Sequence, residues 1–361
     1  MALVFGKELS KTEISRHVGD VSQIAGVRQV TLGDGPENHV RALEFRTGSG
    51  LEFDVLADRG MDISRCTYNG RSIAWRSSSL DQHPSFTNPA GAEWLRTFQG
   101  GLLVTCGLTQ VGSPNEDKGE QLGVHGRYSG LSARDVNVTQ QWDEDEYLLA
   151  ASGKVRESRI FGENLSLERT ITTWLGANSF RITDTVTNEG FRTWPHMILY
   201  HFNIGFPAVA EDSRIHAPST KCIPRDTAAQ TETDQWMTMR PPTKDFAERV
   251  YFHDMKADDD GWVTVALVNE KLAGGPFGVW IRYNQKSLPL FTQWKMNGEG
   301  DYVCGLEPGN CWPLGRSDWR KDGRLVELEP GQSVDYEIEV GIIDGDEDLK
   351  HIVNATGLGT K

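Results

Sequence analysis

The stretch VRALEFRTGSGLEFDVL, residues 40–56, decides the fold class of this chain. Apolar and polar residues alternate on both sides of Thr47-Gly48-Ser49-Gly50, so every second side chain falls on the same face of an extended backbone. A glycine-containing turn between two alternating runs is typical of a β-hairpin. The stretch therefore predicts two antiparallel strands, residues 40–45 and 51–56.

The same two-residue period continues along most of the chain. Gly, Asn, Asp or Pro bounds each further run, as is common at strand ends. The further predicted strands are residues 148–155, 165–174, 180–187, 197–203, 262–268, 277–283 and 334–343. Helices are predicted only for residues 11–17 and 91–98, and residues 84–89 and 218–242 predict long irregular loops.

The short, regular spacing of these strands favours an all-β, double-layer sandwich over a small closed barrel. We expect one domain, with a lead-in over residues 1–39, a core over residues 40–344 and a C-terminal tail over residues 345–361. One face of such a sandwich is concave. Aromatic, His, Arg and carboxylate side chains on a concave face suit a sugar, because its apolar faces and its hydroxyls both find partners there.

The bulk composition argues against several classes of partner. The chain has 361 residues, a formal net charge of -14 and a pI near 5.1. Nucleic acids and anionic membranes are usually bound by a basic face, so we expect a small neutral ligand instead. The sequence shows neither a signal-peptide pattern nor the roughly 20 apolar residues of a membrane span, so we expect a soluble, cytoplasmic protein. Whether it is a monomer or a homodimer stays open.

Metal and cofactor sites are not predicted. The five cysteines include no CxxC pair, so reduced and mostly buried thiols are expected. No HxH or HExxH motif occurs, and the acidic run at residues 258–260 lacks the spaced ligands and terminal Glu of a calcium loop. The glycine-containing turns lack the strand-to-helix context of a nucleotide loop. We therefore expect neither a metal ion nor a cofactor.

Three stretches carry side chains suited to acid–base work on a sugar ring. Glu307 follows a strand-like run at residues 301–305, His201 lies in the strand predicted at residues 197–203, and His125 lies in a glycine-rich loop. A carboxylate and two imidazoles could transfer protons if the fold brings them together. The ordinary alternatives are a salt bridge at a sheet end for Glu307 and satisfied core imidazoles for the two histidines.

Neighbouring residues supply further candidates. Trp294 and Trp312 flank Glu307 and are the preferred pocket aromatics. His196 is five residues from His201, so the two side chains are expected on opposite faces of the strand, and His196 is expected to be structural.

The motifs that carry a family resemblance are VLADRGMDI at residues 55–63, GVHGR at residues 123–127, and the stretches 183–190, 199–207 and 305–311. In this order they resemble the aldose 1-epimerase (galactose mutarotase-like) superfamily. More narrowly, most of the chain looks like a bacterial branch labelled DUF4432. The resemblance implies a galactose mutarotase-like β-supersandwich with a few short helices, and catalysis by a Glu base and a His acid without a cofactor.

In the well-studied mutarotases, Leu-His-Gly-Gly, His-x-Tyr-Phe-Asn and Leu-Glu stretches supply a substrate-binding His, the acid His and the base Glu. By this resemblance His125 matches the first, His201 the second and Glu307 the third. Laying residues 202–203 on the family's Phe-Asn pair puts the acid position on Leu199. His201 lies two residues further along, and therefore on the same face of the strand.

The resemblance also implies substrate contacts. Arg127 replaces the family's second Gly and predicts a smaller pocket, or one suited to an anionic or highly oxygenated sugar. Arg59 and Arg127 are expected to hold ring hydroxyls. Asp58 and Arg59 either contact the ligand in this way or lock a turn together with Asp62.

Trp294 and Lys295 complete the predicted substrate-binding set. A cation such as Lys295 beside Glu307 would hold that carboxylate ionised. A strongly anionic substrate would need a cluster of arginines beside Glu307, and the candidates are Arg59, Arg76, Arg127 and Arg316.

The predicted function is that of an aldose 1-epimerase, which interconverts the α and β anomers of a free or modified sugar. Glu307 would remove the anomeric proton and His201 would protonate the ring oxygen from the opposite side of the ring. The C1–C2 bond then turns, and the ring closes on its other face. Two alternatives remain: an isomerase or lyase that abstracts a proton from a keto-sugar, and a non-catalytic sugar-binding protein.

Overall fold

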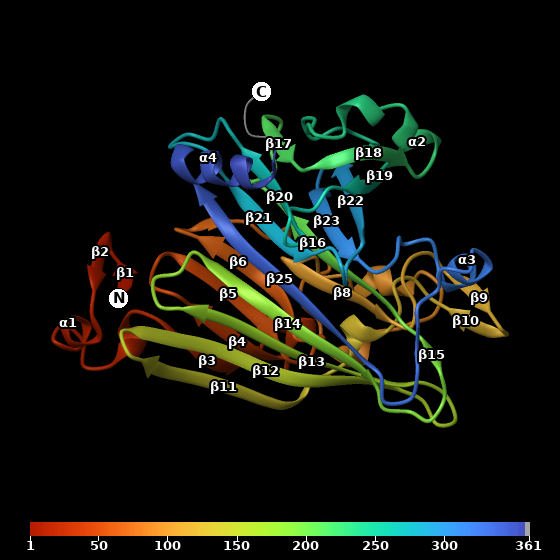
Figure 1. Ribbon diagram of the computed structural model, residues 1–361, viewed down its shortest axis with the longest axis horizontal. Helices are drawn as coiled ribbons and strands as arrows, with labels where there is room; N and C mark the ends of the chain where they lie inside the picture. The colour runs from red at the N-terminus through yellow and green to blue at the C-terminus, as the bar shows by residue number, and fades with distance from the viewer. Residues whose placement is uncertain (358–361) are drawn as a thin grey trace.

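Two large antiparallel sheets lie against each other in the computed structural model, which describes residues 1–357 (Figure 1). In spatial order, the eight-stranded sheet contains β11 (Arg134–Asp143), β12 (Glu146–Ser158), β13 (Asn164–Trp174), β14 (Ser179–Asn188), β25 (Ser333–Asp344), β21 (Phe277–Asn284), β20 (Trp262–Asn269) and β17 (Ser213–His216). The 11-stranded sheet contains β18 (Ser219–Pro224), β19 (Arg249–Met255), β22 (Leu290–Asn297), β23 (Tyr302–Gly309), β16 (Met197–Ile204), β8 (Leu103–Leu108), β6 (Asp62–Tyr68), β5 (Leu51–Leu56), β4 (Arg41–Arg46) and β3 (Gly26–Thr31), with β7 (Arg71–Ser72) paired to β6. The all-β prediction is confirmed, and every predicted strand is present.

The remaining elements are short. Three two-stranded ribbons are formed by β1 (Ala2–Val4) with β2 (Lys7–Leu9), β9 (Asn115–Asp117) with β10 (Glu120–Leu122), and β15 (Trp194–Pro195) with β24 (Glu327–Leu328). The α-helices are α1 (Lys11–Ser15), α2 (Thr227–Gln230), α3 (Arg316–Lys321) and α4 (Asp346–Ala355). None of the helices in residues 1–357 has the length and apolar character that a bilayer crossing requires.

Strand β25 shows why the two sheets pack together. Tyr336, Ile338 and Val340 are buried in the core between the sheets, whereas the alternating residues Glu337 and Glu339 are less buried. Burying one apolar face of each sheet against the other removes a large apolar area from water. The two-residue period in the sequence therefore determines which face of each sheet is internal.

Strand β16 is buried on both faces. Ile198, Tyr200 and Phe202 lie in the core between the sheets, whereas Leu199 belongs to a second apolar cluster on the opposite face of the 11-stranded sheet. Alternation places His201 on the same face as Leu199. The second apolar cluster therefore covers the outer face of the 11-stranded sheet near its centre. The candidate site lies on this face.

The structure corrects four local predictions. Residues 218–242 are not an irregular loop, because they contain β18 and α2; the weak alternation of burial along β18 explains why periodicity missed it. Residues 91–98 contain a 3-10 helix, Glu93–Thr97, instead of an α-helix. The lead-in contributes β3 to the 11-stranded sheet, so the core begins before residue 40. The predicted tail contains α4, and its residues 358–361 lie outside the described part.

Candidate functional site

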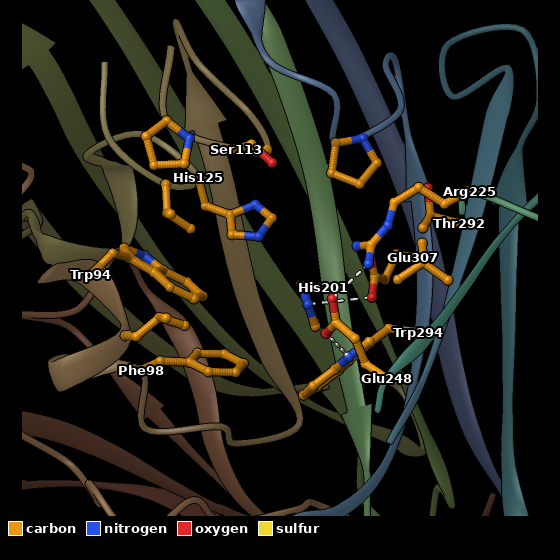
Figure 2. A pocket seen from close by; sticks show the side chains of 16 residues that line it. Trp94, Phe98, Ser113, His125, His201, Arg225, Glu248, Thr292, Trp294 and Glu307 are labelled. Carbon is orange, nitrogen blue, oxygen red and sulfur yellow. Dashed lines mark hydrogen bonds and ion pairs between the residues drawn. The ribbon is translucent and has the colours of Figure 1, made fainter. Parts of the chain in front are cut away.

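A pocket of about 250 Å³ opens over the outer face of the 11-stranded sheet. Its volume lies a little below the roughly 300–1,000 Å³ of ordinary small-molecule sites, so it suits a small ligand. Strands β16, β22 and β23 supply the floor, and the walls come from the loops that carry Trp94 and His125 and from a segment around Arg225 and Glu248. Figure 2 shows these side chains converging on one space.

His201 and Glu307 form the centre of the floor. Strands β16 and β23 are antiparallel neighbours with Phe202 opposite Leu306, so His201 and Glu307 are opposed on the other face. The His201 Nε2 atom lies 3.3 Å from Glu307 Oε1, and the two residues are only 6% and 2% exposed. The two residues that the sequence predicted as catalytic are thus brought into contact (Figure 2).

Burial determines the protonation preference of this pair. Desolvation raises the pKa of Glu307 well above its ordinary value, the Glu248 carboxylate raises it further, and the Arg225 guanidinium opposes both effects. Desolvation, with a smaller contribution from His125, lowers the pKa of His201 to about 3. Both directions favour the uncharged form of each group. When the pair holds one proton, both shifts therefore favour its placement on Glu307, with His201 neutral.

His125 lies across the pocket from Glu307 (Figure 2). Its backbone has a φ of +56°, and Gly126 follows with a φ of +77°. The His125 ring lies 4.9 Å from the Trp94 ring and 5.8 Å from the His201 ring, measured between centroids. Desolvation lowers the pKa of His125 to about 4, so the imidazole is neutral near pH 7. Its Nδ1 atom is buried and has no hydrogen-bond partner within residues 1–357.

A close approach of two loops holds this wall together. A Cβ atom on Gly123 would lie 1.9 Å from the carbonyl oxygen of Pro89, so no other residue fits there without moving a loop. The loop after Pro89 carries Trp94 and Phe98, whose rings stack with centroids 4.4 Å apart. The glycine thereby fixes the aromatic wall against the His125 loop.

The opposite wall is polar and was not predicted. Arg225 Nη2 donates to Glu248 Oε1 at 2.8 Å, and Trp294 Nε1 donates to Glu248 Oε2 at 2.8 Å. Arg225 also pairs with Asp226 at 2.8 Å. No recognisable motif surrounds Arg225 or Glu248, and they lie next to strands β18 and β19, neither of which was predicted. Trp294, which was predicted, does line the pocket.

Arg59 does not contact this pocket. Its guanidinium is buried and donates to the carbonyl oxygens of Ser129, Gln82 and Thr97 at 2.7, 3.0 and 2.8 Å, and to Gln99 Oε1 at 2.9 Å. These bonds tie distant loops to the sheet. Arg59 is therefore a structural residue, and the predicted contact with ring hydroxyls is corrected.

Asp58 and Asp62 also have structural partners. Asp58 pairs with Arg41 at 2.6 Å, not with Arg59. Asp62 accepts a hydrogen bond from Arg169 Nη1 at 2.8 Å, and Arg169 also pairs with Asp184 at 2.7 Å. All three members of this last cluster are buried between the sheets. Neither predicted alternative holds, because both aspartates pair with arginines from other strands and not with Arg59.

Lys295 and Arg127 lie outside the pocket. Lys295 follows Trp294 in β22 and so projects from the other face, where it donates to the carbonyl oxygen of Gln235 at 3.2 Å. It is fully buried, and desolvation lowers its pKa. Arg127 is exposed and lines a separate cavity. Neither residue holds Glu307 ionised or narrows the pocket, contrary to prediction.

The predicted arginine cluster is absent from the described residues around Glu307. Arg76 pairs with Asp81 at 2.7 Å, and Arg316 pairs with Asp117 at 2.8 Å, both away from the pocket. The dispersed arrangement contradicts the idea of an arginine-rich site for a strongly anionic substrate.

Two remaining candidates also lie outside the pocket. Trp312 stacks on Phe252 instead, with centroids 4.8 Å apart. His196 is buried, with Nε2 2.7 Å from the Tyr336 hydroxyl, so it is structural, as predicted. Within residues 1–357, no three His, Cys, Asp or Glu side chains gather in a group that could hold a metal ion.

Solved structures share this architecture. A candidate aldose 1-epimerase from Klebsiella pneumoniae superposes with a TM-score of 0.87 at 27% identity, covering 92% of this chain and 87% of that one. A galactose mutarotase-like protein from Clostridium acetobutylicum has a TM-score of 0.61 at 13% identity, covering 89% and 99%. A galactose 1-epimerase from Lactobacillus acidophilus has a TM-score of 0.58 at 12% identity, covering 89% and 100%. The last two likenesses show a common fold, so the prediction of a galactose mutarotase-like fold is confirmed.

One family model matches the chain. No curated protein matches the chain. The model of a family described as a domain of unknown function, DUF4432, matches residues 37–342, which is most of the chain. The chain therefore belongs to the DUF4432 family.

Proposed function

We propose that this protein is a carbohydrate enzyme that interconverts the α and β anomers of a small, uncharged aldose. The observation that carries the proposal is the buried His201–Glu307 pair, 3.3 Å apart on the floor of a pocket of suitable size. The likeness to the Klebsiella structure, which is described as a candidate aldose 1-epimerase, supports it.

The positions of the pair require a different geometry from the one predicted. A sugar ring cannot lie between two atoms 3.3 Å apart, so His201 and Glu307 act from the same side. The ring oxygen and the anomeric oxygen are both bonded to C1, and two adjacent groups can therefore reach both. One group accepts the anomeric proton while the other donates to the ring oxygen.

The single proton shared by the pair keeps this exchange balanced. For ring opening, Glu307 gives its proton to His201 and becomes the base, and the imidazolium becomes the acid. The ring C1–O bond breaks as Glu307 takes the anomeric proton and His201 protonates the leaving ring oxygen. Ring closure reverses these transfers, so the pair again holds one proton and no cofactor takes part.

His125 is placed to serve the open-chain intermediate. His125 faces the His201–Glu307 pair across the pocket, so it can contact the carbonyl oxygen while the C1–C2 bond turns and before Glu307 returns the proton on closure (Figure 2). A neutral imidazole can donate one hydrogen bond to that oxygen. His125 would thus stabilise the turned aldehyde before the ring closes on its other face.

The charges of the pocket favour an uncharged substrate. Glu307 favours its uncharged form, and the guanidinium that lines the pocket, Arg225, is already bound by Glu248 and Asp226. A sugar acid or sugar phosphate would place its charge beside Glu248 without a free cation to balance it. Neutral hydroxyls, by contrast, can donate to Glu248 and accept from Arg225.

Saturation-transfer NMR between anomers tests the proposal with a panel of neutral aldoses, uronic acids and sugar phosphates. Accelerated exchange confined to neutral aldoses is the expected result. Loss of a carbon-bound substrate proton to solvent deuterium would instead support a keto-sugar isomerase or lyase, because mutarotation exchanges no carbon-bound hydrogen. Binding without either reaction would support a sugar-binding protein.

A further inference from the structure

A second cavity lies behind the aromatic wall of the candidate site. It has a volume of about 220 Å³ and shares one residue, Trp94, with the first pocket. The indole separates the two spaces, since Trp94 stacks on Phe98 and lies against His125 in the first pocket while its Nε1 donates to Ser129 Oγ, at 3.0 Å, in the second.

The chain reversal after His125 directs Arg127 into this second cavity. His125 and Gly126 both have left-handed backbone conformations, and the side chains on either side of Gly126 line different cavities. The Arg127 backbone is held in place because its N–H donates to the Gly107 carbonyl at 3.1 Å. Its side chain is the one charged group lining the cavity within the part of the chain that the structure describes.

The Arg127 guanidinium is available for a ligand. Within residues 1–357 it forms no ion pair, in contrast to Arg225, which two carboxylates hold. The acidic side chain that its charge influences is Glu157, whose carboxylate already accepts from Leu108 N at 2.6 Å and Thr109 Oγ1 at 2.7 Å. The two cavities therefore differ, because the arginine of the first is held in an ion pair and the arginine of the second, within the described residues, is not.

We propose that this second cavity binds a small hydroxycarboxylate. A guanidinium presents two parallel N–H donors that match the two oxygens of a carboxylate. Asn88 and Ser129 offer polar partners for a hydroxyl, and Leu131 and Pro89 provide apolar contact for a short carbon body. The volume of about 220 Å³ is enough for a ligand of a few carbon atoms. This binding does not depend on the chemistry proposed for the first pocket.

Glycerate is a suitable probe, and its affinity can be measured by saturation-transfer difference NMR. Arg127→Gln removes the guanidinium, and because that side chain is exposed the fold should persist, which a thermal unfolding curve checks. Arg134→Gln is the matched control, since Arg134 is also exposed and lines neither cavity. Arg225→Gln tests for binding in the first pocket.

Wild type, Arg134→Gln and Arg225→Gln should bind glycerate equally, and Arg127→Gln about tenfold or more weakly, as expected for loss of a charge-assisted hydrogen bond. Glycerate binding that is absent from the wild type, insensitive to Arg127→Gln, or abolished by Arg225→Gln would overturn the proposal. None of these results depends on whether the protein interconverts anomers.

Discussion

His201 and Glu307 occupy directly opposed positions on β16 and β23, and their side chains meet with Nε2 3.3 Å from Oε1. The pair is buried, and desolvation moves the two pKa values in opposite directions. Two titratable groups in contact gain and lose protons as a unit. The apparent pKa values in a pH–rate profile should therefore belong to the pair and not to either residue alone. Mutations that change the charge around the pair should therefore change the pH dependence of catalysis.

Replacing Glu248 tests this electrostatic coupling. The Glu248 carboxylate raises the pKa of Glu307, and it also holds Arg225. In Glu248→Gln the loss of the carboxylate and the release of Arg225 both favour ionised Glu307, so the alkaline limb of the pH–rate profile, where the pair loses its one proton, should move to lower pH. The profile of anomer exchange gives the measurement, and Glu299→Gln, an exposed carboxylate outside the pocket, is the control. An unshifted or upward-shifted alkaline limb in Glu248→Gln would contradict the coupling.

Gly123→Ala should disturb the aromatic wall. The new Cβ would lie 1.9 Å from the Pro89 carbonyl oxygen, so the loop that carries Trp94 and Phe98 must move. We expect a several-fold higher KM for the sugar, because the wall shapes the pocket. Gly33→Ala is the control, since a Cβ there meets nothing within 4 Å. Equal kinetics for the two variants would show that the loop contact does not shape the pocket.

The buried His196 should make stability fall as the pH is lowered. Its folded-state pKa is about 4, because desolvation opposes protonation, whereas in the unfolded chain it is about 6.5. Below pH 6.5 the unfolded chain takes up a proton that the folded protein does not, so stability is lost between about pH 6.5 and pH 4. For one such group the loss between pH 7 and pH 5 is about 2 kcal/mol.

Urea unfolding of wild type and His196→Gln at these two pH values checks this contribution. The variant should be less stable at pH 7, because the Tyr336 and Leu108 partners of the imidazole are lost. Its further loss on going to pH 5 should nevertheless be smaller than that of the wild type. An identical pH dependence in both proteins would show that His196 does not titrate in this way.

Arg169→Met should destabilise the sandwich strongly. The substitution leaves Asp62 and Asp184 buried without their cation, and breaking a buried pair typically costs about 3–5 kcal/mol. Arg28→Met removes an exposed partner of Glu44 and should cost less than about 1 kcal/mol. The denaturant midpoints of the two variants give their relative stabilities. Similarly small losses of stability in both would mean that the buried cluster contributes little to the stability of the fold.

Local pattern predicted the strands well because burial alternates along them. β4, β5 and β25 each carry an apolar face that the other layer covers, and their period appears directly in the sequence. β8, β18 and β19 are among the strands that were missed, and burial does not alternate clearly along them. The layered fold could therefore be predicted, but its strands with weakly alternating burial could not.

A family motif was not enough to place a residue in the pocket, because Arg59 and Arg127 also lie in such motifs and do not line it. Glu307, His201 and His125 lie in such motifs and do meet in one pocket. Arg59 lies in a motif but is held by carbonyl groups from three distant segments, whereas Arg225 lies in no motif and reaches the pocket. The partners of an arginine come from segments far apart in the chain, so the local sequence does not identify them.

The most direct test of the proposed function is anomer exchange in wild type and Glu307→Gln, measured by saturation-transfer NMR on neutral aldoses. General acid–base catalysis usually contributes about 10²–10⁴-fold, so the variant should lose at least about 100-fold in exchange rate while keeping its fold and its affinity for the sugar. Unchanged acceleration in Glu307→Gln, or no acceleration by the wild type with any neutral aldose, would contradict the account.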